Sequence, residues 1–92
     1  MTDRDQTRTL LDRHGITEKW EQVLPLLRHE VRRYLIGKTI SEVCRLRKLS
    51  RPSVARAIND HRILKPSYVR HLLDLMGWGD SAFSRWLRGI NA

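Results

Sequence analysis

The sequence predicts an all-α domain, built as a compact bundle of five or six short helices. Glycines fall where helices would stop, polar residues fall where helices would start, and no segment alternates polar and apolar residues with a period of two. The 92 residues suit one domain, because domains usually span about 100–200 residues. With 40% hydrophobic and 30% charged residues, the composition is that of a globular domain and not of a disordered tail.

We expect residues 1–37 to supply supporting helices. A short helix is predicted from Asp5 to His14. Thr17 is placed to cap a longer helix, whose apolar residues recur at three- and four-residue steps over residues 20–35. Pro25 interrupts this apolar stripe, and because the stripe keeps its phase we expect a bend there and not a break.

Residues 39–59 are predicted to form two short helices joined by a tight turn. Thr39-Ile40-Ser41-Glu42 is a capping box that opens a helix of about eight residues. Ser50 is placed to cap the second helix, where Pro52 is tolerated because the first N–H groups of a helix lack intrahelical partners. The residues expected to face inward are Ile40, Val43, Cys44 and Leu46, followed by Val54, Ala57 and Ile58. This is the apolar pattern of a helix-turn-helix, whose two helices cross at about 90–120°.

Residues 66–92 are predicted to form two further helices. One runs from Pro66-Ser67 to Gly77, and the other is capped by Asp80 or Ser81 and closed by Gly89. Aromatic enrichment with charge depletion is typical of an interface core, so we interpret this stretch as a dimer surface. The alternative is that the same side chains close the domain's own core. The residues concerned are Trp78, Phe83, Trp86, Leu87 and Ile90.

The positive charge is concentrated in the middle of the chain. Residues 28–70 hold twelve basic and three acidic side chains, net +9, whereas residues 1–27 carry −1 and residues 71–92 carry no net charge. Arginine dominates, and its planar fork suits phosphate and guanine. Such a zone indicates nucleic-acid binding or, less often, an acidic membrane surface, and composition alone does not choose between them.

The stretch T-I-S-E-V-C-R-L-R-K-L-S-R-P-S-V-A-R-A-I-N (39–59) resembles the DNA-reading helix-turn-helix of bacterial repressors. The stretch K-P-S-Y-V-R-H-L-L-D-L-M-G (65–77) resembles the helix that follows it in the Cro/C1, or lambda-repressor-like, family. One departure is Lys48, at the turn position usually held by glycine, where a left-handed backbone costs about 1 kcal/mol or somewhat more. The whole chain is also similar to small plasmid-encoded global repressors of the KorC type.

The resemblance implies which side chains meet DNA, because the second helix of such a motif enters the major groove with its first residues at the base edges. We expect base contacts from Arg51, Pro52, Ser53 and Arg56. An arginine that grips a guanine contributes roughly 1–3 kcal/mol of discrimination, and the alternative is solvated surface or a phosphate contact. Pro52 is more simply explained as a helix-start residue. Phosphate contacts are expected from Lys38, Thr39, Lys48, Ser50, Arg62 and Lys65.

The sequence predicts no enzyme, no metal or cofactor and no small-molecule ligand. The four histidines lack paired metal-ligand spacing, and the five glycines lie at helix ends and not in a phosphate-binding loop. Cys44, the single cysteine, is expected in the core and fits a reducing cytoplasm. Because no apolar run approaches about 18 residues and the start lacks an apolar signal core, we expect no membrane span and no secretory leader.

These patterns together predict a cytoplasmic, sequence-specific repressor that binds a palindromic operator as a homodimer. We expect the helix at about residues 51–59 in the major groove and half-sites about one helical turn apart. The alternative is a protein-interaction module, such as a DNA-binding antitoxin that masks a partner protein through its C-terminal aromatic residues. A third interpretation is sequence-blind binding to the nucleoid or to RNA.

Overall fold

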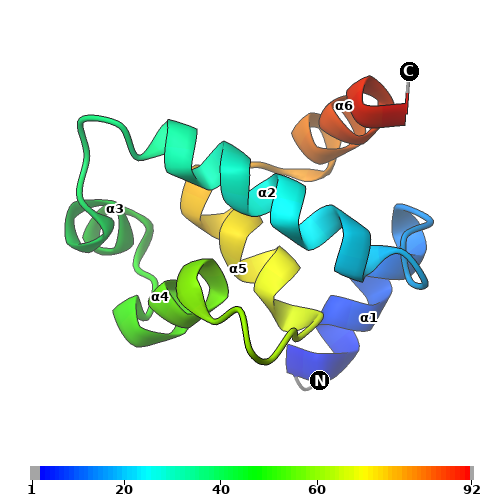
Figure 1. Cartoon of the computed structure of the whole chain (residues 1–92), viewed down its shortest axis with the longest axis horizontal. Coiled ribbons are helices and arrows are strands. Elements are labelled where there is room, and N and C mark those ends of the chain that lie inside the picture. Colours follow the sequence, from blue (N-terminus) through cyan, green and yellow to red (C-terminus); the bar gives the residue numbers. More distant parts are fainter. Residues whose placement is uncertain (1–2, 92) are drawn as a thin grey trace.

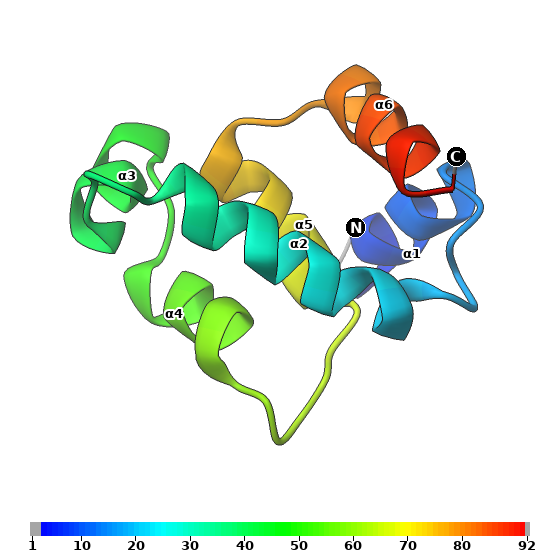
Figure 2. The same cartoon turned by 45° about the horizontal axis from the view of Figure 1, so that its top comes forward.

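The computed structural model describes the backbone of residues 3–91 and the side chains of residues 6–90. The elements in this range are α1 (Asp3–Arg13), α2 (Trp20–Tyr34), α3 (Ile40–Arg47), α4 (Arg51–Asn59), α5 (Ser67–Met76) and α6 (Asp80–Asn91). No strand occurs among them, so the all-α prediction is confirmed. Helices α3 and α4 lie together at one end of the molecule, and α6 lies with the end of α1 at the other (Figures 1 and 2).

Helix α5 is the centre of the fold. It contacts α1, α2, α3 and α4, and Figure 1 shows it crossing the middle of the molecule. The predicted stripe of Val69, Leu72, Leu73 and Met76 is buried, and so are Tyr68 and Leu75. Because a fully buried apolar side chain contributes about 1.5–3 kcal/mol, this helix is the main anchor for the elements around it.

Helix α2 continues unbroken through Pro25, so the prediction that this proline does not split the helix is confirmed. Pro25 lies on the exposed face, while Val23, Leu24 and Leu27 are buried. The proline removes one backbone donor, which would have served the Glu21 carbonyl, and both Pro25 and Glu21 are exposed residues.

Three local predictions are wrong. Helix α2 begins at Trp20 and not near Thr17, whose hydroxyl instead donates to the Asp12 carboxylate. Leu46 is 72% exposed, on the outer face of α3. Helix α6 continues past Gly89 to Asn91, because Gly89 does not adopt the left-handed backbone that ends a helix.

The C-terminal helix closes the domain's own core. Phe83 is fully buried, with its ring centroid 4.7 Å from that of His14, and Leu87 is buried beside it. Their assignment to a dimer surface is therefore corrected: both side chains are buried in the domain's own core, which was the alternative for this stretch. Trp78 and Trp86 are half-buried and Ile90 is exposed, so these three remain at the surface.

Candidate nucleic-acid interface

The turn between α3 and α4 is tightly built. The Thr39 hydroxyl accepts from the Glu42 N–H at 3.1 Å, and the Glu42 carboxylate accepts from the Thr39 N–H at 3.4 Å, which completes the predicted capping box. Lys48 adopts the left-handed backbone (φ 58°, ψ 46°), as expected at a position suited to glycine. The Leu49 N–H then donates to the Cys44 carbonyl at 2.8 Å. These hydrogen bonds fix where α3 begins and ends, and therefore where the chain enters α4.

Helix α4 starts in solvent. Ser50 occupies the predicted cap position with extended backbone, but its side chain makes no capping hydrogen bond and instead accepts from the Ser53 hydroxyl at 3.2 Å. Pro52 lies in the first turn, as predicted. Arg51, Pro52 and Arg56 are exposed, and Ser53 is half-buried. The side chains predicted to contact bases therefore lie on or next to the free surface of α4.

The opposite face of α4 is held in the core by Val54, Ala57 and Ile58, all of them buried as predicted. Cys44 of α3 is buried against this side, and burial raises the pKa of its thiol. It therefore serves as a small core residue. The first turn of α4 contains no acidic side chain, so its partial positive charge is not offset there.

A buried arginine holds the other end of α4. Arg28 of α2 is 3% exposed, and its Nε donates to the Ala57 carbonyl at 2.8 Å. One of its terminal nitrogens donates to the Asp60 carbonyl at 2.9 Å, so a single guanidinium bonds two carbonyls at the C-terminus of α4. The guanidinium carbon of Arg28 lies over the Tyr68 ring, 5.9 Å from its centre. Burial lowers the pKa of this guanidinium, which nevertheless stays charged at any physiological pH.

Asp60 and Tyr68 join the end of α4 to the start of α5. The Tyr68 hydroxyl donates to the Asp60 carboxylate at 2.9 Å, and the Ile63 N–H donates to its other oxygen at 3.3 Å. The hydrogen bond from Tyr68 is the main reason why the pKa of Asp60 lies below its ordinary value. Burial, followed by the same bond, raises the pKa of Tyr68. Together with Arg28, this pair fixes the direction of α4.

The residues predicted to contact phosphate are all exposed: Lys38, Thr39, Lys48, Ser50, Arg62 and Lys65. Lys38 lies over the Tyr34 ring, 4.8 Å from its centre, and donates to the Tyr34 carbonyl at 3.0 Å. Thr39 is already engaged in the capping box. The remaining four come from the α3–α4 turn and from the connector that follows α4, and so lie before and after that helix in the chain.

The positive charge available to a partner is smaller than the sequence count suggests. Arg28 is inside the core. Arg70 is half-buried, donates a hydrogen bond to the Gln6 side-chain oxygen at 2.6 Å and forms an ion pair with Asp74 at 3.8 Å. Arg47 donates to the Tyr34 hydroxyl at 3.3 Å and packs on Gly77, so it braces α3 against α2 and the end of α5. These three arginines have structural roles within the fold.

Sequence reasoning missed Arg28 as a positioning residue, although a signal was present. Arg28 follows Leu24 by four residues and precedes Val31 by three, so it lies in phase with the apolar stripe of α2. An arginine on a buried face requires acceptors inside the fold, because burying an unpaired charge is costly. The pattern thus indicated a buried guanidinium, but not what it would bond.

Among the side chains described, no three metal-ligating groups come together. None of the helices described has both the length and the apolar composition needed to cross a membrane. Comparisons with protein-family models, curated proteins and solved structures gave no match.

Proposed function

We propose that this chain is a cytoplasmic, sequence-specific DNA-binding repressor that inserts α4 into the major groove and binds its operator as a homodimer. The observation that carries the proposal is the free leading end of α4. Arg51, Pro52 and Arg56 are exposed there, on a helix whose other face and far end are fixed. Repression, as opposed to activation, rests on the resemblance of residues 39–77 to Cro/C1-type repressors.

The arrangement suits base reading for two physical reasons. A guanidinium that bonds O6 and N7 of guanine contributes roughly 1–3 kcal/mol of discrimination, provided that its helix is held in a fixed direction. Arg28, Asp60 and Tyr68 supply that rigidity from the side of α4 away from solvent. The uncapped N-terminus of α4 favours a phosphate, and the exposed Lys48 and Arg62 add positive charge before and after the helix.

The proposed dimer surface consists of Trp78, Trp86 and Ile90. The ring centroids of Trp78 and Trp86 lie 5.9 Å apart, and both side chains line a shallow cleft of about 300 Å³. Trp86 and Ile90 belong to α6, which lies at the other end of the molecule from α4 (Figures 1 and 2). Trp78 lies in the connector before α6, next to Gly77, on which Arg47 of α3 packs. Two copies joined through α6 leave both α4 helices free to face DNA, and we expect half-sites about one helical turn apart.

The same surface carries the second candidate function. A half-buried pair of tryptophans that lines a surface cleft beside Ala82 is suited to binding a partner protein of another sequence, as in an antitoxin that masks its toxin. The two candidates differ in what occupies the cleft. Sedimentation of the pure chain as a dimer at micromolar concentration favours the homodimeric repressor, whereas a monomer that co-purifies with a small protein favours the interaction module.

Competition binding tests the main proposal. Duplexes enriched from a random DNA library by the full chain should compete at least about 10³-fold better than random duplex of equal length. Arg56→Ala should relax the base preference at one position of the half-site, whereas Lys65→Ala should weaken binding to every duplex and reduce the salt slope by about one. Arg88→Ala is the matched control, because it removes the same charge from the exposed face of α6.

The outcome against the proposal is equally concrete. If enriched and random duplexes compete equally, the chain binds nucleic acid without reading sequence. If Arg56→Ala and Lys65→Ala change binding in the same way, Arg56 contacts phosphate and not a base.

A further inference from the structure

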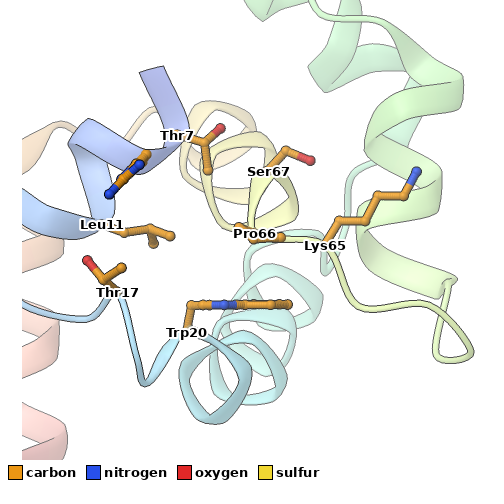
Figure 3. Close-up of a pocket in the computed structure, with 8 residues that line it drawn as sticks. Thr7, Leu11, Thr17, Trp20, Lys65, Pro66 and Ser67 are labelled. Atoms are coloured by element: carbon orange, nitrogen blue, oxygen red, sulfur yellow. The ribbon is translucent and has the colours of Figure 1, made fainter. Parts of the chain in front are cut away.

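A cavity of about 610 Å³ opens between α1, the beginning of α2 and the beginning of α5. Leu11, which is buried, forms part of its floor, and Trp20 and Pro66 form apolar walls. Figure 3 shows the Trp20 ring edge-on, with one face turned towards Leu11 and Pro66. Small-molecule sites in proteins typically occupy about 300–1,000 Å³ and combine apolar walls with a few polar groups. Size and lining therefore both suit a small ligand.

The charged side chains that line the cavity are Arg8 and Lys65, and both are positive. Asp12 is not part of the lining, but its carboxylate lies 4.0 Å from the Arg8 Nε and accepts from the hydroxyl of Thr17, which does line the cavity. Both members of this pair are exposed, so their attraction is weak and leaves Arg8 able to turn towards another anion. Figure 3 shows the Lys65 side chain extending away from Trp20, so its stem and not its amino group forms the wall.

We propose that this cavity binds a planar aromatic acid. The aromatic ring lies against the face of Trp20 with Leu11 beneath it, and the carboxylate meets Arg8 at the mouth. A flat apolar wall selects a flat ring, because offset stacking on an indole adds to the gain from burying apolar area. The sequence predicted no small-molecule ligand, and this cavity is the reason to depart from that prediction.

The cavity is connected to α4 through the short segment after that helix. Asp60 anchors one end of the segment through its bonds with Tyr68 and the Ile63 N–H, and Lys65 and Pro66 at the other end form the cavity wall. The ring of a bound acid thus packs beside the stem of Lys65 and restricts the side chain whose amino group we expect to contact phosphate. This second part rests on the proposed function: an occupied cavity weakens DNA binding about as much as the loss of one phosphate contact.

The binding test uses 2-naphthoate, titrated into the ¹⁵N-labelled full chain and followed by amide and indole chemical shifts. We expect saturable shifts in α1, at the start of α5 and at the Trp20 indole. Trp20→Leu should weaken binding about tenfold, whereas Trp86→Leu, which alters a half-buried indole on α6, should leave it unchanged. Thr17→Phe fills the mouth of the cavity from an exposed position and should abolish binding. This second variant keeps the test decisive if Trp20→Leu perturbs folding.

Two further measurements test the charge. Uncharged 2-naphthylmethanol should bind several-fold more weakly than 2-naphthoate, and Asp12→Asn should tighten naphthoate binding by freeing Arg8. The proposal is overturned if naphthoate shifts gather around Trp78 and Trp86, if Thr17→Phe leaves its affinity unchanged, or if the alcohol binds as tightly as the acid.

The coupling is tested separately, by measuring the affinity for an enriched duplex with and without saturating 2-naphthoate. A several-fold loss with naphthoate, absent in Thr17→Phe, supports the coupling. Unchanged DNA affinity with the cavity occupied overturns the coupling and leaves both the ligand site and the repressor function standing. If the chain binds no duplex at all, the proposed function fails, and the chemical-shift experiment still decides the ligand site.

Discussion

Replacing Arg28 with methionine should lower the free energy of unfolding by about 3 kcal/mol, because the buried guanidinium makes two hydrogen bonds to the C-terminus of α4. Hydrogen bonds to charged groups contribute about 1.5–3 kcal/mol each. Part of the stability lost in Arg28→Met is recovered, because the variant no longer has to bury a charged side chain. The carbonyls of Ala57 and Asp60 also lose a partner, and Ala57 is fully buried.

Thermal and urea unfolding, followed by circular dichroism, measure this effect. For a domain of this size 1 kcal/mol corresponds to about 4–8 °C in Tm, so Arg28→Met should unfold about 12–24 °C below the wild type. The Tm of Arg28→Lys should lie between those of the wild type and Arg28→Met, because a single ammonium group replaces only part of the planar guanidinium. Arg32→Met is the matched control: it removes the same charge from the same helix, at an exposed position.

The reasoning is refuted if Arg28→Met and Arg32→Met have the same stability within about 0.5 kcal/mol, the range usual for surface substitutions. That result would mean that the two carbonyls are served equally well by water, and that α4 is held by its apolar face alone. A large loss of stability in Arg28→Met with unchanged DNA affinity at low temperature would instead separate the folding role of Arg28 from the positioning of α4.

Three other substitutions test separate parts of the structure. Lys48→Gly should raise the free energy of unfolding by about 0.5–1 kcal/mol in urea, since glycine relieves the left-handed strain at φ 58° but adds chain entropy; equal or lower stability contradicts the turn geometry. Phe83→Ala should lower it by about 3–5 kcal/mol at every protein concentration, whereas a residue of a dimer surface would show its effect only through association. Asp60→Asn should make the free energy of unfolding depend less on pH in the acidic range, because the folded pKa of Asp60 is lowered. The stabilisation by the ionised Asp60 is complete above the unfolded pKa of about 3.9 and is lost as the pH falls through the folded pKa. The gap in Tm between wild type and Asp60→Asn should therefore close on acidification, and a constant gap from pH 7 to pH 2 would exclude the ionised carboxylate as its cause.

Local signals explain why residues 39–59 could be predicted closely. The capping box sets the start of α3, and Lys48 and Ser50 mark the turn and the next start, all through bonds between near neighbours in the chain. Leu46 was mispredicted within the same segment. At 3.6 residues per turn it lies roughly 110° from the centre of the face formed by Ile40, Val43 and Cys44, which is too far to reach the core.

The features that sequence could not provide depend on contacts between distant residues. Arg28 and its acceptors are 29 and 32 positions apart, and nothing in the local pattern names the partner of a buried arginine. Phe83 and Leu87 show the same limit, because an apolar helical face indicates burial without saying whether it is against the same chain or a second copy. The cavity beside Trp20 is likewise formed by three separate segments.

The exposed beginning of α4 as a DNA-reading surface is the claim on which the proposed function depends, and the protein side of the complex tests it most directly. Amide chemical shifts of the full ¹⁵N-labelled chain should be measured while an enriched duplex is titrated in. We expect the largest changes over residues 48–56, with smaller ones at Arg62 and Lys65 and none at Gly89 or Ile90 beyond those caused by dimerisation. Shifts centred on α6, with residues 48–56 unperturbed at saturation, would contradict the account.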